Sequence, residues 1–245
     1  MLILFAGPIH GRLKQLYTSA ARLEEELGES ISWILQTGDL GVWPDPSRIP
    51  RSVRRRGAES QFASMYLKEQ EVPIPTLFVA GIHEDHAFLN YKCSQGKMEI
   101  LPGLHYLMPG FSTVIGDQEE KVSVVGVGKS YSPQVYNGKS TKGLKAVRHY
   151  ARRDIERACS QGLIDILLSY EAPAGANLGA NLISSAEGLQ KVAFAVRPKI
   201  AVHRGAAGSD FLQYEAQTTN TLTLRLPPLS FFVIKYEEGQ LTPLN

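Results

Sequence analysis

The chain has 245 residues, of which 43% are hydrophobic and 20% charged, a composition that can bury a core and excludes global disorder. Lysine and arginine number 26 against 24 aspartates and glutamates, and a net charge of +2 excludes a polyanion as the dominant partner. The two cysteines, Cys93 and Cys159, cannot build a disulfide framework, and no apolar run approaches the roughly 20 residues of a membrane span. We therefore expect an intracellular, cytoplasmic protein with no membrane partner, and leave a nuclear location open.

Short apolar runs alternate with amphipathic runs in the first 80 residues. Strands are predicted for the short apolar runs at 2–6, 31–36 and 76–80. Apolar residues recur at helical spacing over 13–27, where Gly28 ends the helix, and a second helix is predicted over 58–70. This β-α-β-α-β order favours a largely parallel sheet that is covered on both faces.

The rest of the chain mixes Pro- and Gly-punctuated strands with two further helices. Strands are predicted at 104–108, 111–115, 122–127, 164–169 and 200–203, and helices at 144–161 and 183–195. Gly116-Asp117 is a candidate hairpin turn, and the tail is predicted to form antiparallel strands at 222–226 and 231–236. No repeat or linker marks a boundary, so we expect one α/β domain over 1–245, with its core at about 2–237 and two sheets.

The loops that follow the predicted strands are the places to search for chemistry, because ligands bind beyond the carboxyl ends of strands in sheets of this kind. Five of these loops carry polar residues. They read Gly7-Pro8-Ile9-His10-Gly11, Gly38-Asp39-Leu40, Gly81-Ile82-His83-Glu84, Ser169-Tyr170-Glu171-Ala172-Pro173 and His203-Arg204-Gly205-Ala206-Ala207.

In order and spacing, these loops resemble the motifs of the calcineurin-like metallophosphoesterases, which are Asp-x-His, Gly-Asp, Gly-Asn-His-Glu, a lone His before a Pro, and Gly-His-x-His. The resemblance runs from residue 2 to about residue 237. It is nearest to the subgroup of the RNA lariat debranching enzymes and their relatives, where a strand ending in Ser-His-x-x-Pro follows an Arg-His-containing helix, much as Arg148-His149 precedes Pro173 here. The resemblance implies a single-domain, two-sheet sandwich flanked by helices.

In that family two metal ions, bridged by the Asp of the second motif, activate a water molecule, and the His of the third motif protonates the leaving oxygen. The resemblance places two metal ligands on His10 and Asp39, and the catalytic acid on His83. The other five ligand positions fall on Pro8, Ile82, Tyr170, Gly205 and Ala207. Proline, isoleucine, glycine and alanine cannot ligate a metal through their side chains, so the binuclear centre is expected to be lost.

Two hypotheses follow from this pattern. The first is a non-catalytic protein with no metal cofactor, which acts as an interaction module for a protein partner and, through its basic loops, for RNA or phosphate. The alternative is a divergent metal-dependent phosphodiesterase or phosphatase. It would hold one Mn, Fe or Zn ion at an atypical mononuclear site built on His10 and Asp39, with His203, His86 or Asp85 recruited from nearby loops.

Several of these residues also have simpler structural explanations. Asp39 can cap backbone amides in a tight turn. Tyr170 is expected to fill space with its ring and to use its hydroxyl in a hydrogen bond, rather than to bind a metal. The acidic residues between His83 and His86 can cap the start of a helix, where the helix dipole favours negative charge.

Two clusters of basic residues remain. The first contains five arginines, Arg48, Arg51, Arg54, Arg55 and Arg56, and the second contains seven lysines and arginines between residues 139 and 157. We interpret Arg54, Arg55 and Arg56 as a phosphate-binding rim, because guanidinium groups make bidentate contacts with phosphate. The simpler alternative is a solvated surface and an exposed loop, since aromatic residues for base stacking are scarce in both clusters.

Overall fold

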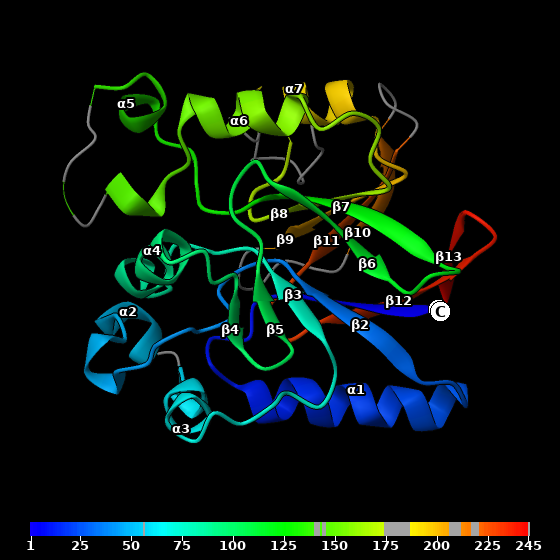
Figure 1. Ribbon diagram of the computed structural model, residues 1–245, viewed down its shortest axis with the longest axis horizontal. Helices are drawn as coiled ribbons and strands as arrows, with labels where there is room; N and C mark the ends of the chain where they lie inside the picture. The colour runs from blue at the N-terminus through cyan, green and yellow to red at the C-terminus, as the bar shows by residue number, and fades with distance from the viewer. Residues whose placement is uncertain are drawn as a thin grey trace.

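Two β-sheets lie face to face, with helices on the outer side of each, in the computed structural model of the chain (Figure 1). The structure describes residues 1–55, 57–139, 143, 146–173, 187–205, 212–216 and 221–244, with the backbone alone for 212–216. The predicted α/β class with a two-sheet sandwich is confirmed.

The first sheet has seven strands in the order β13-β12-β1-β2-β3-β5-β4. Its parallel centre consists of β1 (Leu2–Ala6), β2 (Ile31–Gln36), β3 (Thr76–Phe78) and β5 (Leu104–Tyr106). Antiparallel strands complete both edges, and these are β4 (Glu99–Leu101), β12 (Phe231–Glu237) and β13 (Gln240–Leu244). The sheet thus continues past residue 237, where the sequence places the end of the core.

The second sheet has six strands in the order β10-β11-β9-β8-β7-β6. Four of them are parallel: β7 (Lys121–Val127), β8 (Ile166–Ser169), β9 (Ile200–Arg204) and β11 (Thr221–Leu226). The edge strands β6 (Ser112–Gly116) and β10 (Leu212–Ala216) pair antiparallel with their neighbours. The predicted turn at Gly116-Asp117 connects β6 to β7, so the second sheet is mixed as expected.

Strand β1 shows why the sheets stack as they do, because it is apolar on both faces. Ile3 and Phe5 belong to the core between the two sheets, together with residues of β8 and β9 such as Leu168. Leu2 and Leu4 point the other way and pack with residues of the first long helix. A strand that is buried on both faces reads as a continuous apolar run, as the Leu-Ile-Leu-Phe-Ala sequence does.

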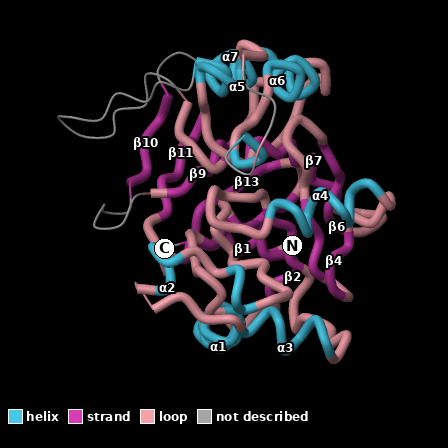
Figure 2. Tube along the Cα trace, turned by 90° about the vertical axis from the view of Figure 1, so that its left-hand side faces the viewer, coloured by secondary structure: helices cyan, strands magenta, loops and turns pink. Residues whose placement is uncertain are grey.

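The helices form the two outer layers. They are α1 (Leu13–Leu27), α2 (Arg51–Arg54), α3 (Gln61–Leu67), α4 (His86–Ser94), α5 (Pro133–Tyr136), α6 (Arg152–Cys159) and α7 (Glu187–Val196), with 3-10 turns η1 (Pro46–Arg48) and η2 (Ala146–Arg148). Figure 2 shows α1 and α3 on one side of the sheets and α6 and α7 on the other. None of the helices in the part of the chain that the structure describes is long and apolar enough to cross a membrane.

The predicted elements match closely at the start of the chain and less well after residue 140. β1, α1 and β2 occupy the predicted residues, whereas the helix predicted over 58–70 is the shorter α3. The helix predicted over 144–161 is wrong as one element. Its described part is divided into η2 and α6, because His149 forms an isolated bridge with Ser130 and the amide of Tyr150 donates to the Ser130 carbonyl. Of the helix predicted over 183–195, residues 183–186 lie outside the described residues.

The two strands predicted in the tail are present as β11 and β12, and each pairs antiparallel with a neighbour, although not with the other. β11 and β12 belong to different sheets, and Pro227-Pro228 carries the chain from one sheet to the other. This crossing passes directly beside Gly7, where a Cβ atom would lie 2.0 Å from the Pro227 carbonyl oxygen. The strands β4, β10 and β13 and the helices α2 and α5 were not predicted from the sequence.

Candidate functional site

The loops that follow β1, β2, β3 and β8 meet at one edge of the molecule, as predicted. The His10 amide donates to the Asp39 carbonyl at 2.8 Å, and the Gly11 amide donates to the Leu40 carbonyl at 2.7 Å. The approach is so close that a Cβ atom on Gly41 would lie 2.2 Å from the Gly11 nitrogen. The sequence places glycine here because no side chain fits between the two loops.

Asp39 is the centre of this site. Its side chain is buried, and its backbone has a φ of 54°, in the left-handed region. The Oδ1 atom accepts a hydrogen bond from the His83 amide at 3.0 Å, and Oδ2 accepts one from the hydroxyl of Tyr170 at 2.8 Å. Both carboxylate oxygens of Asp39 are therefore engaged by groups of the protein itself.

Tyr170 fills the space beside Asp39. Its ring is buried at 1% exposure and lies between two glycines, since a Cβ atom on Gly38 or Gly81 would come within 2.6 Å of it. The Arg204 guanidinium lies 4.3 Å from the ring centroid. Burial, and then the Asp39 carboxylate, raise the pKa of the Tyr170 hydroxyl, so it acts as a neutral hydrogen-bond donor. The geometry expected for Tyr170 from the sequence, a space-filling ring with a bonded hydroxyl, is present.

His10 and His83, predicted as a metal ligand and a catalytic acid, flank Asp39. Their ring centroids are 6.1 Å apart, in an edge-to-face arrangement, and both residues are partly buried. The Nε1 atom of Trp43 donates to the His83 carbonyl at 2.7 Å, which helps to position this loop. The structure thus brings His10, Asp39 and His83 together, and their predicted roles remain predictions.

Two more carboxylates lie behind this site. Glu84 is buried and accepts a hydrogen bond from the Leu40 amide at 2.7 Å through Oε1. Burial, and then the nearby Asp39 carboxylate, raise the pKa of Glu84 well above its usual range. Asp85 accepts a hydrogen bond from the Phe88 amide and forms an ion pair with Arg48 at 2.8 Å. Asp85 therefore caps helix α4, which agrees with the simpler explanation of this acidic segment.

The donor set does not fit the metals that the fold family implies. Within the described residues, no group of three or more His, Cys, Asp and Glu side chains could hold a metal ion. Pro8, Ile82 and Gly205 offer no ligating side chain, and Ala207 lies outside the described residues. The hydroxyl at position 170 donates a hydrogen bond to the Asp39 carboxylate. A catalytic zinc site uses about three protein ligands, more than this site assembles.

The two histidines considered for recruitment to a single-metal site are both buried. His203 is buried, its Nδ1 lies 2.9 Å from the Arg204 carbonyl oxygen, and burial lowers the pKa of the ring to about 4. His86 is buried at the start of α4, where burial, and then Lys129 and Arg148, lower the pKa of its ring to about 3. Both histidines are therefore neutral near pH 7.

The predicted phosphate rim is partly used for internal contacts. The Nη2 atom of Arg54 donates to the carbonyls of Pro46, Ser47 and Ile49 at 3.1 to 3.3 Å, so this guanidinium holds its own loop. Arg55 is exposed, and Arg56 lies outside the described residues. The prediction that these three arginines bind phosphate is not tested by this arrangement.

Sequence reasoning missed two residues near this edge. Arg204 was placed in a functional loop, but nothing indicated that it would lie over Tyr170. Lys129, after β7, was not singled out, although a φ of 69° for a non-glycine residue marks an unusual position. Neither the contact of Arg204 with Tyr170 nor the position of Lys129 leaves a signal in the local sequence, because each depends on loops that are distant along the chain.

Comparisons with known proteins agree with this fold. No family model matches the chain. A lariat debranching enzyme of Entamoeba histolytica is 25% identical over 190 residues, covering 73% of this chain and 52% of that enzyme. The chain thus spans about half the length of this curated relative.

Two solved structures share the architecture across almost the whole chain. TT1561 of Thermus thermophilus superposes with a TM-score of 0.60 at 13% identity, covering 100% of this chain and 98% of its own. GAP50, described as the anchor in the inner membrane complex of Plasmodium, superposes with a TM-score of 0.55 at 10% identity, covering 96% of this chain and 80% of its own. The fold is that of the metallophosphoesterases. Together with the lariat debranching enzyme relative at 25% identity, it supports the resemblance of this chain to the calcineurin-like metallophosphoesterases.

Proposed function

We propose that this protein is a catalytically inactive member of the calcineurin-like metallophosphoesterase family and acts as an interaction module. The single observation that carries the proposal is the contact between Tyr170 and Asp39. The residue at the position of the family's lone metal-binding His donates a hydrogen bond to the carboxylate that would bridge two metals, at 2.8 Å. Its ring also occupies the space between Gly38 and Gly81.

The other replacements support the same proposal. Pro8 is buried and Ile82 partly buried at positions where the family has an Asp and an Asn. Apolar groups in place of charged ligands give an edge that can be covered by a partner at a lower desolvation cost. The fold also occurs in GAP50, which is described as an anchor, and this supports a non-catalytic use of the same architecture.

We expect the ligands to be a protein partner and RNA or phosphate. The similarity to a lariat debranching enzyme supports RNA as the ancestral substrate class, while the basic residues of the loops supply positive charge for phosphate. We place the protein inside the cell, in the cytoplasm or nucleus, because Cys93 and Cys159 are free thiols.

The alternative is a divergent phosphodiesterase with one weakly held metal ion. The observation that favours it is the meeting of His10, Asp39 and His83 at one edge, with the two rings 6.1 Å apart. Such an enzyme would have to displace the Tyr170 hydroxyl from Asp39 before this carboxylate could bind a cation.

Metal content and turnover separate the two candidates. The protein is purified without chelator, its transition metals are measured by mass spectrometry, and hydrolysis of an aryl phosphodiester and of a branched RNA is followed in Mn²⁺. We expect substoichiometric metal and no turnover above that of Asp39→Asn. Stoichiometric metal with turnover that disappears in Asp39→Asn would refute the proposal and establish the alternative.

A further inference from the structure

A cavity whose lining does not include Asp39 lies beside helices α4 and α5. It has a volume of about 690 Å³ and opens between α4, α5, η2 and the start of α6. Its lining includes Asn90, Lys129, Tyr136, His149, Arg152 and Arg153. Cavities of about 300 to 1,000 Å³ hold small organic ligands, so this one has room for more than a simple ion.

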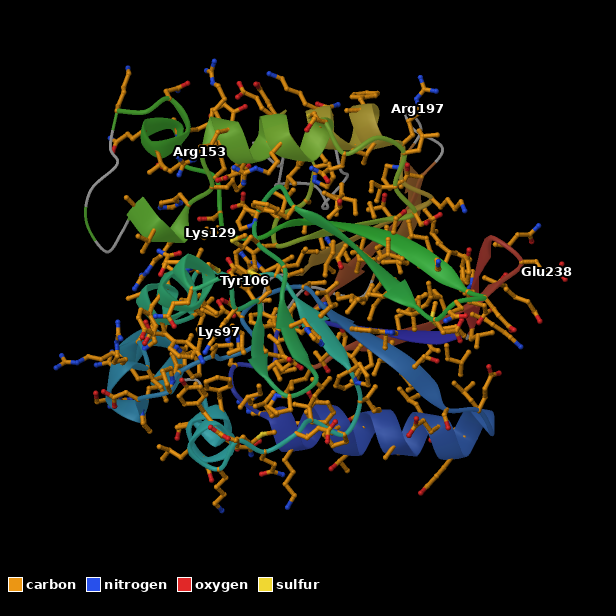
Figure 3. The ribbon with its side chains drawn as sticks, viewed as in Figure 1. Lys97, Tyr106, Lys129, Arg153, Arg197 and Glu238 are labelled. Atoms are coloured by element: carbon orange, nitrogen blue, oxygen red, sulfur yellow. The ribbon has the colours of Figure 1, made fainter. Side chains whose placement is uncertain are left out.

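Lys129 is the residue that distinguishes this cavity. Its backbone has a left-handed φ of 69° and is held by a hydrogen bond from its amide to the Ala80 carbonyl at 2.5 Å. Its side chain is partly buried, and among the described residues it forms no ion pair and no side-chain hydrogen bond. Figure 3 shows Lys129 between the α4 layer and the segment that carries Arg153.

The carboxylate that faces Lys129 is already engaged. Asp154 lines the cavity, but its Oδ2 accepts a hydrogen bond from the Ala151 amide at 2.8 Å, and its Oδ1 lies 3.7 Å from Arg157. Burial lowers the pKa of the Lys129 ammonium even though Asp154 acts in the opposite direction. The ammonium thus loses solvation without a full counter-charge from the protein. A bound anion would supply that counter-charge.

Two arginines add positive charge at the same cavity. Arg153 is exposed, with no ion pair among the described residues. Arg152 is held in place, because its Nη2 donates to the Asn137 side chain at 3.0 Å and its guanidinium lies 5.3 Å from the centroid of the Tyr136 ring. The cavity therefore combines one partly buried cation, two further guanidinium groups and an aromatic ring.

We propose that this cavity binds the phosphate group of a nucleotide, with Lys129 as its inner anchor and Arg152 and Arg153 at the rim. A phosphate matches the excess of cations, while the volume and the Tyr136 ring suit the nucleoside part. The proposal rests on the proposed binding of RNA or phosphate, for which it names a cavity, and it holds whether or not Asp39 binds a metal.

The test measures binding to the full-length protein by isothermal titration calorimetry, with three probes: inorganic phosphate, AMP and a short single-stranded RNA. In Lys129→Met the affinity for AMP is expected to fall by about 10- to 150-fold, since a charge-assisted hydrogen bond is worth roughly 1.5–3 kcal/mol. Lys97→Met is the matched control, because Lys97 is exposed beyond the end of α4. The affinity of this variant for AMP should equal that of the wild type.

A second pair of variants covers the case in which Lys129→Met does not fold. Arg153→Gln should weaken AMP binding by a smaller factor, and Arg197→Gln, an exposed arginine at the end of α7, should leave it unchanged. Binding of AMP without RNA indicates a free nucleotide, and tighter RNA binding indicates a nucleotide within a strand. Both outcomes support the proposed site if the binding is weaker in Lys129→Met than in the wild type. No saturable binding of any probe, or equal losses in the control variants, would overturn the proposal.

Discussion

The site around Asp39 and the cavity around Lys129 differ in whether the protein itself supplies partners for their charged groups. In the site around Asp39, both carboxylate oxygens accept hydrogen bonds from the protein, and the Tyr170 ring packs between Gly38 and Gly81. In the cavity beside α5 and α6, the Lys129 ammonium has no ion-pair partner among the residues that the structure describes, and the one carboxylate facing it is engaged elsewhere.

This difference shows which of the two sites needs a ligand to balance its charge. A buried ion that is hydrogen-bonded by its own chain gains little from an external counterion, whereas a desolvated ion without a partner gains much. The charge of Asp39 is matched by contacts within the protein, whereas Lys129 is a cation without a matching anion. We therefore expect mutations near Asp39 to change the stability of the fold and mutations near Lys129 to change binding.

The largest effect is expected when the packing around Asp39 is disrupted. In Gly81→Ala, the new Cβ atom would lie 2.2 Å from the Asp39 Oδ1 atom and 2.5 Å from the Asp39 backbone nitrogen. Because backbone cannot move aside as a flexible side chain can, we expect a loss of about 3 kcal/mol in the free energy of unfolding, measured by urea denaturation.

Gly188→Ala serves as the control for that variant. Gly188 lies in helix α7, and its added Cβ atom would meet only the Ile155 side chain, at 3.0 Å. Alanine has a higher helix propensity than glycine by about 1 kcal/mol, so this variant should lose little stability or gain some. If Gly81→Ala is as stable as Gly188→Ala, the close packing of Asp39 against Gly81 is wrong.

A smaller effect is expected from two tyrosine variants, which compare the site around Asp39 with the side of the cavity around Lys129. Tyr170→Phe removes the hydroxyl that donates to Asp39 Oδ2 and leaves a buried carboxylate oxygen without this donor, which should cost about 2 kcal/mol. Tyr150 is also fully buried, and it packs near Tyr136 on the side of the cavity, but its hydroxyl has no hydrogen-bond partner among the described residues. Tyr150→Phe should therefore leave stability unchanged or raise it.

Thermal and urea unfolding of both tyrosine variants measure the contrast. A Tyr170→Phe variant that is as stable as Tyr150→Phe would mean that the hydroxyl does not hold Asp39. In that case Asp39 would be available to a cation, and the alternative function would gain support.

Much of this arrangement was predictable from the sequence, because the relevant signals are local. The apolar run of β1, the helical spacing of α1 and the glycines beside Asp39 each specify their own conformation. The resemblance of five loops then placed Asp39 and Tyr170 at one edge, although 131 positions separate them. The burial of Lys129 and the contact of Arg204 with Tyr170 were not predictable, because they depend on which distant loops meet and leave no pattern in the residues nearby.

The smallest expected effect is a pH dependence that originates at Glu84. Burial, and then Asp39, raise the pKa of Glu84 in the folded protein. The contribution of Glu84 to the free energy of unfolding is therefore present below its unfolded pKa and is lost as the pH rises through its folded pKa. Glu84→Gln removes this titration and can keep the acceptor for the Leu40 amide. We expect the variant to gain stability over the wild type between pH 5 and pH 8, as measured by urea denaturation at each pH. The exposed Glu119→Gln should show no such trend, and equal behaviour of the two variants would contradict the burial of a carboxylate beside Asp39.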